Sequence, residues 1–303
     1  MFESLDRTLA ELASQDELWY HPNPGNAGDA LIATATWQRF RHLGIRVRPV
    51  PRDGFSARGK VVLYGGGGNL VPMYRQASDF LESHHQGAKR LVLLPSTVDG
   101  HGKLLSALGP NCILFCREKV SYDHCRRWAP NARVELSHDL ALGLEPGRLA
   151  QPSFPDWTTL LLRAMRVSRS RGRIEGAGLS EAWRLATASR ALVPLATRSG
   201  HSLDAFRGDR ESGRDSLPAG NLDLSEMLSL KDVSETAMRA CAALLVRSLR
   251  GWKQVRTDRL HVCIAASLVG TSVEFHPNSY FKCAAIWEHS LRGRFPSIRW
   301  VEA

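Results

Sequence analysis

The sequence of 303 residues contains no apolar run long enough to cross a membrane as a helix. Such a helix needs about 20 consecutive apolar residues. The N-terminus also lacks the apolar stretch of a secretory signal, because residues 1–20 are interrupted by acidic side chains. We therefore expect a protein with neither a transmembrane span nor a signal peptide.

Cysteine is sparse and is not arranged as a metal site. There are six cysteines, with no C-x-x-C pair and no paired zinc spacing. The histidine pair His84 and His85 has no third ligand at a suitable spacing. The sequence thus predicts reduced thiols in the cytoplasm, no metal and no cofactor.

Basic residues exceed acidic ones, 40 against 30, which gives a formal net charge of +10. Such an excess can serve nucleic acid, an anionic membrane surface or a small phosphorylated ligand. Zinc fingers, recognition-helix patterns and basic stripes interleaved with aromatics are missing, so we expect no nucleic-acid partner. The arginines between Arg163 and Arg173 fit a solvated face or a surface for anionic substrate or lipid head groups.

Short apolar strands alternate with helical patterns through the first half of the chain. The buried-strand runs end in turn-forming or polar residues, as in a doubly wound parallel sheet. The second half resumes the pattern, with a polar, glycine-rich stretch at 198–221 that we expect to be a mobile loop. Strands are predicted at 17–21, 61–64, 91–94, 112–116, 134–136, 158–162, 253–257 and 271–275, and helices at 30–43, 74–85, 121–128, 225–250, 258–269 and 281–291.

A stretch rich in proline and glycine at 147–155 divides the pattern in two. We therefore predict an α/β protein with an N-terminal Rossmann-like domain over 1–148 and a C-terminal one over 156–303. The last helix is free to pack back on the first domain.

The segment Asp258-Arg259-Leu260-His261 follows a predicted strand and opens a helix. Ligands of parallel α/β sheets bind beyond the carboxyl ends of the strands, where helix N-termini attract anions. Arg259 offers a planar fork for phosphate or carboxylate, and His261 exchanges protons near neutral pH. The alternative makes Asp258 a helix cap and Arg259 a solvated charge.

Two further loops offer weaker signals of the same kind. The four glycines before Asn69 lack the endings of a P-loop or a dinucleotide fold, so a purely structural turn is an equal alternative. Asn26 and Asp29 precede a helix, where they either cap it or hold sugar hydroxyls. Arg117, at a strand end, is either a second anion ligand or a salt-bridge partner of Glu118 or Asp123.

Taken in order, these segments resemble the polysaccharide pyruvyl transferase family. The resemblance rests on seven short motifs spread over the chain: N-x-G-D at 26–29, a strand with GGGGN at 61–69, LLPS at 93–96, CREKVSY at 116–122, SHDLAL at 137–142, TDRLH at 257–261 and NSYFK at 278–282. Where many members have P-Q-S, this chain has Pro95, Ser96 and Thr97. No motif of the family is recognised between residues 165 and 225.

The resemblance implies two Rossmann-like domains that face a cleft, as in GT-B glycosyltransferases. It also implies transfer of the enolpyruvyl unit of phosphoenolpyruvate onto two hydroxyls of one sugar. The family's donor-binding residues would fall on Arg117, Arg259 and His261. The acceptor would be a saccharide of a cell-surface or exopolysaccharide precursor, either free or lipid-linked, with peripheral contact at the inner face of the membrane.

On this basis we assign roles to the residues of the predicted site. His261 is the general acid and Asp29 accepts hydroxyl protons. Donor contacts are predicted at Arg117, Arg259, Leu260, His261, Gly66 and Gly67, and acceptor contacts at Asn26, Asp29, Asn69, Ser96 and His138.

Two other functions fit the same sequence. A GT-B glycosyltransferase that uses a nucleotide sugar would share the architecture and a basic site. A non-catalytic basic α/β protein that binds anionic partners would share the charge alone.

Overall fold

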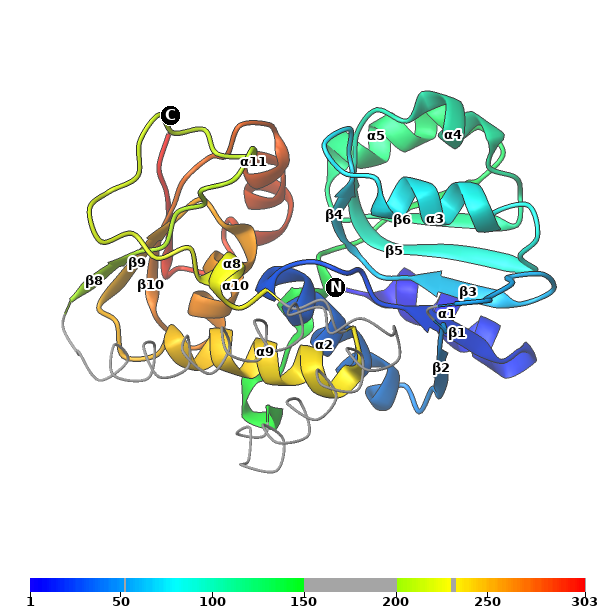
Figure 1. Cartoon of the computed structure of the whole chain (residues 1–303), viewed down its shortest axis with the longest axis horizontal. Helices are drawn as coiled ribbons and strands as arrows, with labels where there is room; N and C mark the ends of the chain where they lie inside the picture. The colour runs from blue at the N-terminus through cyan, green and yellow to red at the C-terminus, as the bar shows by residue number, and fades with distance from the viewer. Residues whose placement is uncertain (52, 150–200, 230–232, 303) are drawn as a thin grey trace, which may run out of the picture. The chain divides into compact units, whose positions relative to one another are not determined.

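The computed structural model describes residues 1–51, 53–149, 201–229 and 233–302. These fall into two compact units (Figure 1). Unit 1 contains Met1–Asn23, Ala35–Gly143 and Ala284–Arg292. Unit 2 contains Pro24–Thr34, Leu144–Cys283 and Gly293–Ala303. Each unit is therefore built from separate stretches of the sequence.

Unit 1 is organised around a parallel sheet of seven strands. The order along the sheet is β2-β1-β3-β5-β6-β7, and β4 pairs with β5 beyond the end of β3. The strands are β1 (Leu18–His21), β2 (Val47–Pro49), β3 (Val61–Tyr64), β4 (Gly67–Leu70), β5 (Arg90–Val98), β6 (Cys112–Cys116) and β7 (Arg133–Leu136). The parallel sheet predicted for the first half of the chain is confirmed.

Strand β5 is longer than the sequence predicts. Its apolar run stops at Leu94, yet the strand continues through Pro95 to Val98. The pairing of β5 with β6 shifts its register between Leu93 and Ser96. Proline has no N–H for the ladder, so an irregularity at this point is what allows the strand to continue.

Helices cover both faces of this sheet. On one face, α3 (Gln76–His84), α4 (Gly102–Ala107) and α5 (Lys119–Trp128) pack on a core of buried aliphatic and cysteine side chains. Trp19 packs against this core, and its neighbour Tyr20 makes edge-on ring contacts with Trp37 and Phe40 of α2 (Ala27–His42). Adjacent strand residues point to opposite faces, so α2 covers the second face. Figure 1 shows α1 (Glu3–Gln15), an element the sequence did not suggest, on that side too.

Unit 2 contains a second parallel sheet, of four strands in the order β11-β10-β9-β8. These are β8 (Ser202–Asp204), β9 (Gln254–Thr257), β10 (Ser272–Phe275) and β11 (Ile298–Trp300). Strand β8 lies inside the stretch predicted as a mobile loop, so that prediction was wrong for residues 202–204. A three-residue strand with one buried side chain is too short a pattern to recognise in the sequence. Strand β8 is defined by its pairing with β9, which the sequence alone does not show.

The helices of unit 2 also differ from the prediction in one place. The expected helix over 225–250 is instead a short α8 (Leu224–Met227) and a longer α9 (Glu235–Ser248). Each starts with its own side-chain cap, Asp223 for α8 and Ser234 for α9. Helix α10 (Leu260–Leu268) follows β9, and α11 (Lys282–Ile286) continues into a π-helical turn, Trp287–Leu291.

Three sequence predictions lie outside the described residues. They are the strand at 158–162, the arginine cluster from Arg163 to Arg173, and most of the boundary stretch at 147–155. Two short 3-10 turns, η1 (Leu140–Gly143) and η2 (Pro146–Arg148), lead up to that stretch.

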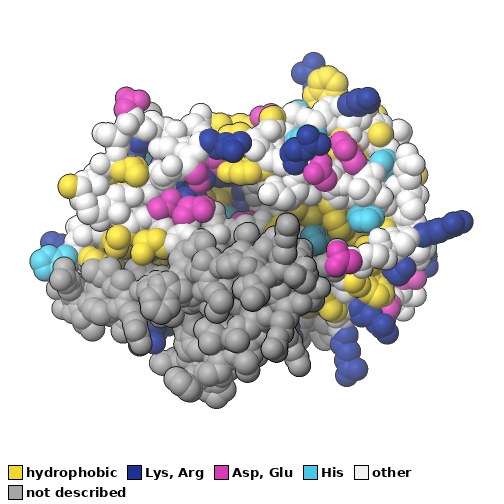
Figure 2. All heavy atoms as spheres, in the orientation of Figure 1, with side chains coloured by type: hydrophobic (Ala, Val, Ile, Leu, Met, Phe, Trp, Pro, Cys, Tyr) yellow, Lys and Arg dark blue, Asp and Glu magenta, His cyan; other side chains and the backbone are white. Residues whose placement is uncertain are grey.

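The described surface carries mixed charge. In Figure 2, the Lys and Arg side chains that are drawn stand apart, with Asp and Glu side chains among them. Within the described ranges, no helix combines the length and the apolar character that crossing a membrane requires.

The tight backbone contacts around Gly66 give a test of this fold. A Cβ at Gly66 would lie 2.5 Å from the carbonyl oxygen of Pro95, whereas one at Gly147 would meet nothing within 4 Å. Gly66→Ala should lower the free energy of unfolding by about 1–3 kcal/mol, measured by urea denaturation. Gly147→Ala is the matched control and should be close to neutral; equal effects of the two changes would contradict the packing.

Candidate functional site

The start of α2 is shaped by a reciprocal cap. The side chain of Asn26 accepts a hydrogen bond from the backbone N–H of Gly28 at 2.9 Å. In return, the carboxylate of Asp29 accepts one from the backbone N–H of Asn26 at 3.0 Å. This is a capping box in which both partners satisfy N–H groups that the first helical turn leaves open. The cap alternative for the N-x-G-D motif is therefore realised in the structure.

His261 lies against this first turn of α2. A Cβ at Gly28 would stand 2.5 Å from Nδ1 of His261 and 3.0 Å from Oδ1 of Asn26. Only a glycine at this position lets the imidazole approach so closely. The glycine of the N-x-G-D motif and the histidine of the D-R-L-H motif thus meet in unit 2.

Arg259 occupies the N-cap position of α10, with an extended backbone and no side-chain cap. Its backbone N–H donates to Oγ1 of Thr257 at 3.0 Å. Asp258, which the sequence offered as a cap, instead accepts from the backbone N–H of Arg207 at 2.8 Å. Thr257 donates to the carbonyl of Ala205 at 2.6 Å. These bonds fix the end of β9 to the chain that leaves β8.

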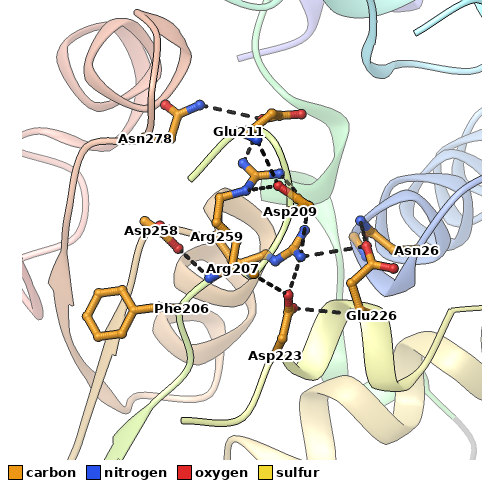
Figure 3. A network of polar contacts seen from close by, with 12 residues as sticks. Asn26, Phe206, Arg207, Asp209, Glu211, Asp223, Glu226, Asp258, Arg259 and Asn278 are labelled. Carbon is orange, nitrogen blue, oxygen red and sulfur yellow. Dashed lines mark hydrogen bonds and ion pairs between the residues drawn. The ribbon is translucent and has the colours of Figure 1, made fainter. Parts of the chain in front are cut away.

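The guanidinium of Arg259 is buried among carboxylates, with its side chain only 4% exposed. Its Nη2 lies 2.5 Å from Asp223, 3.0 Å from Asp209 and 3.6 Å from Glu226 (Figure 3). Its Nε is also buried and has no hydrogen-bond partner among the described residues. Nη2 is thus held by the protein, whereas the buried Nε is a polar group that the described residues leave without a partner.

A second set of ion pairs, made by Arg207, adjoins the carboxylates that pair with Arg259, because Asp209 belongs to both sets. Arg207 donates to Asp209 at 2.8 Å and to Glu211 at 2.6 Å. Glu211 also accepts from Lys282 in a very short contact and from Asn278 at 3.5 Å. Asn278 and Lys282 belong to the N-S-Y-F-K motif, which therefore anchors the segment that carries Asp209. Asn26 joins these residues by donating to Glu226 at 3.2 Å, and Asp258 by accepting from the backbone of Arg207. We call the whole set the Arg259 cluster: Asn26, Arg207, Asp209, Glu211, Asp223, Glu226, Asp258, Arg259, Asn278 and Lys282.

The pKa values of two carboxyl groups in the cluster are shifted in opposite directions. Burial raises the pKa of Asp258 above its ordinary value, although nearby Arg207 and Arg259 oppose this. Burial acts the same way on Asp209, but the hydrogen bond from Arg207 and the charges of Arg259 and Arg207 outweigh it. They lower the pKa of Asp209 to about 2. Asp209 therefore remains an anion, which balances the buried arginines.

Arg117, the second predicted donor ligand, lies in unit 1 and is 1% exposed. Its Nη1 donates to Asp139 at 2.7 Å and its Nε to Thr97 at 2.9 Å. Its salt-bridge partner is thus Asp139 rather than Glu118 or Asp123. Glu118 instead caps α5 through Ser121, and burial raises its pKa.

The glycine loop of unit 1 is shaped by close backbone packing. A Cβ at Gly65 would meet the backbone nitrogen of Asn23 at 2.4 Å, and Gly66 is similarly enclosed by Pro95. The structural alternative therefore accounts for these two glycines without a ligand. Gly67 opens β4.

The predicted acceptor residues of unit 1 also have internal partners. Asn69 donates to the Asn23 side chain and, at 3.1 Å, to the hydroxyl of Tyr64. Ser96 donates to the carbonyl of Leu94 at 2.8 Å. His138 contacts Ser290 through Nδ1 at 2.8 Å and stacks on His289 at 4.6 Å between ring centroids.

The structure thus gathers the predicted residues in two groups. Asn26, Asp29, Arg259 and His261, with buried Leu260 between the last two, lie in unit 2. The other group, in unit 1, consists of Gly66, Gly67, Asn69, Ser96, Arg117 and His138. Among the described residues, no cluster of His, Cys, Asp and Glu has the geometry of a metal site.

The sequence analysis missed the acidic partners of Arg259. Asp209 lies in the stretch 198–221 that the sequence predicts as a loop, Asp223 follows that stretch, and Glu226 lies in the helix predicted over 225–250. One signal was available: Asp223-Leu224-Ser225-Glu226 has the spacing of a capping box, and Asp223 does cap α8. The pairing of Asp209 with two arginines has no local signature, because those partners lie on other elements.

The low pKa of Asp209 predicts a pH-dependent contribution to stability. A carboxylate with a folded pKa near 2 and an ordinary value of 3.8 stabilises the fold above about pH 4, and this effect disappears as the pH falls towards 2. Asp209→Asn should therefore lower the free energy of unfolding by about 2 kcal/mol near neutral pH. In urea titrations, the difference from wild type should shrink between pH 4 and 2. Asp215→Asn is the control, because Asp215 is exposed. If the difference in free energy of unfolding between Asp209→Asn and wild type did not change with pH, the ion pairing would be contradicted.

Comparison with known proteins gives matches of three kinds: a family model, a curated relative and a solved structure. The family model described as polysaccharide pyruvyl transferase matches residues 26–228. A candidate pyruvyl transferase of Bacillus subtilis (strain 168), EpsO, is 27% identical over 161 residues, which are 48% of this chain and 50% of that protein. The chain thus matches about half the length of this curated relative. The solved structure of a functionally uncharacterised protein of Klebsiella pneumoniae subsp. pneumoniae NTUH-K2044 is 26% identical, with a TM-score of 0.76 over 100% of this chain and 99% of that one.

The family match contains five of the seven motifs recognised in the sequence. It includes residues 165–225, where we recognised no motif, and ends before the motifs at 257–261 and 278–282. Because the match extends over more than half of the sequence, the chain belongs to the polysaccharide pyruvyl transferase family.

Proposed function

We propose that this protein transfers the pyruvyl group of phosphoenolpyruvate onto two hydroxyls of one sugar in a cell-surface or exopolysaccharide precursor. The product is a cyclic pyruvate ketal. The observation that carries the proposal is the pair formed by Arg259 and His261 at the start of α10. Arg259 has a buried Nε without a partner among the described residues, and His261 stands beside the first turn of α2.

Arg259 and His261 match two chemical requirements of the donor, which are binding of its anionic groups and protonation of one of its carbon atoms. Phosphoenolpyruvate carries a phosphate and a carboxylate, both of which pair well with a guanidinium. Arg259 also stands at the N-terminus of α10, and helix N-termini favour anions. In this proposal the donor's anionic groups bind at Arg259, and its reacting carbon atoms face His261.

The reaction then requires proton transfer. His261 protonates C3 of the donor, which leaves a cation at C2 that a sugar hydroxyl attacks. Loss of phosphate and attack by the second hydroxyl close the ketal. The hydroxyl protons need an acceptor, for which the sequence predicts Asp29.

Other parts of the sequence-based assignment stay predictions. They are the donor contacts of Arg117, Leu260, Gly66 and Gly67, the acceptor contacts of Asn26, Asn69, Ser96 and His138, the GT-B-like arrangement of two domains, and peripheral contact with a membrane.

The decisive experiment uses the natural glycan as the acceptor. The surface glycan is isolated from source cells with and without the gene and compared by mass spectrometry for a pyruvate-sized difference. Purified protein is then incubated with phosphoenolpyruvate and the glycan from the deletion strain. Phosphate release that depends on this glycan, with ketal formation, supports the proposal. Nucleotide release from a nucleotide sugar, with no reaction of phosphoenolpyruvate, would replace it by a glycosyltransferase.

Arg259→Lys tests donor binding while keeping a positive charge among the carboxylates. Lysine cannot reproduce the planar fork. Losing a charge-assisted hydrogen bond costs about 1.5–3 kcal/mol, so affinity for phosphoenolpyruvate should fall about 10- to 150-fold in calorimetry. Arg256→Lys is the matched control, because Arg256 lies nearby on β9, pairs with Asp204 and is 43% exposed. Unchanged affinity in Arg259→Lys would remove Arg259 from the donor site.

His261→Ala tests the proton donor. Since a general acid acts as the transition state forms, kcat should fall by about 10² to 10⁴ while donor affinity is retained. His42→Ala, at the exposed end of α2, serves as the control. Weakened donor binding with a normal kcat would make His261 a phosphate ligand instead, and His138 would be the next candidate for the acid.

A further inference from the structure

Glu226 is the most accessible carboxylate around Arg259. Its side chain is 50% exposed, compared with 17% for Asp223 and 27% for Asp209. It stands on the first turn of α8, where its backbone N–H donates to the capping side chain of Asp223 at 3.4 Å. Asp223 in turn pairs with Arg259. The position of Glu226 is therefore fixed by the donor-binding arginine itself.

One oxygen of Glu226 is held and the other is open. Oε1 accepts from the side-chain amide of Asn26 at 3.2 Å and lies 3.6 Å from Nη2 of Arg259 (Figure 3). Among the described residues, nothing forms a hydrogen bond or ion pair with Oε2. A carboxylate held by one oxygen and open at the other is oriented to receive a hydrogen bond from an incoming hydroxyl.

Glu226 and His261 are both placed by the start of α2. The amide nitrogen of Asn26 contacts Glu226, and its amide oxygen accepts from Gly28, the residue against which His261 packs. A proton donor and a proton acceptor therefore flank the same turn. Acid and base roles are divided in this way when one group must give and another must take a proton in a single reaction.

Asp29 is less suited to the role of proton acceptor. Its carboxylate is engaged in the capping box with Asn26. The backbone also covers it, because a Cβ at Gly25 would lie 1.9 Å from Oδ2 of Asp29. Asp29 therefore holds the turn that positions Asn26.

We propose that Glu226 is a catalytic residue that accepts the hydroxyl proton of the sugar acceptor, an inference that rests on the proposed pyruvyl transfer. The two hydroxyl oxygens bond to C2 of the donor one after the other, and each proton passes to Oε2 of Glu226, which gives the first proton to the departing phosphate before it takes up the second. Overall, two C2–O bonds to the sugar form and the C2–O bond to phosphate breaks. Of the two hydroxyl protons, one is balanced by the proton that His261 adds to C3, and the other leaves with inorganic phosphate.

The test compares Glu226→Gln, Glu226→Asp and wild type with phosphoenolpyruvate and glycan from the deletion strain. Glutamine can still accept from Asn26 through its amide oxygen, so the turn is preserved, but it cannot take up a proton. Glycan-dependent phosphate release should fall about 10²- to 10⁴-fold in Glu226→Gln, with calorimetric affinity for phosphoenolpyruvate retained. Glu226→Asp should recover part of the rate. Glu288→Gln is the matched control, since Glu288 is an exposed glutamate that pairs with Arg292, and it should react like wild type.

Three results are distinguishable from this expectation. If wild type itself forms no ketal, the proposed function fails. If wild type is active and Glu226→Gln keeps more than about a tenth of its rate, the role of Glu226 is wrong. If Glu226→Gln binds phosphoenolpyruvate more tightly and reacts faster, Glu226 competes with the donor for Arg259, which also overturns the proposal.

Discussion

Burial of the Arg259 guanidinium is the constraint on which the rest of unit 2 depends. A buried cation is costly unless carboxylates lie close enough to balance it. Here they come from two places in the stretch between β8 and α9, Asp209 and the turn from Asp223 to Glu226. Their ion pairs with Arg259 hold the stretch between β8 and α9 in place, although the composition of much of this stretch favours no regular structure.

The same charges set what the site can bind. Nη2 of Arg259 is held by the protein, so under the proposed function a donor anion would meet an arginine that is already oriented. Orientation in advance lowers the entropy that binding would otherwise cost. In return, the carboxylates reduce the net positive charge of the site. Specificity for a ligand would then depend more on the direction of the remaining hydrogen-bond donors than on attraction by net charge.

Helix capping and chemistry share residues at the start of α2. Asn26 satisfies the N–H of Gly28 through its oxygen and holds Glu226 through its nitrogen. Asp29 closes the cap from the other side. The N-x-G-D motif is therefore explained both by the needs of a helix terminus and by the placement of two titratable side chains, and neither explanation excludes the other.

The sequence by itself determined the α/β class, the core strands of the first sheet, β9 and β10 of the second sheet, and the positions of the motif loops at strand ends. These follow from local patterns: buried strands are continuous apolar runs, and loops that enter helices have characteristic residues. The choice of Arg259 and His261 as site residues stays a prediction. Only the tertiary structure decided which residues pair with Arg259 and Arg117. Asp223 is 36 positions from Arg259, and Asp139 is 22 positions from Arg117. Ion pairs between residues so far apart leave no periodic trace in the sequence, because they depend on how strands and helices pack rather than on the spacing of side chains along one element.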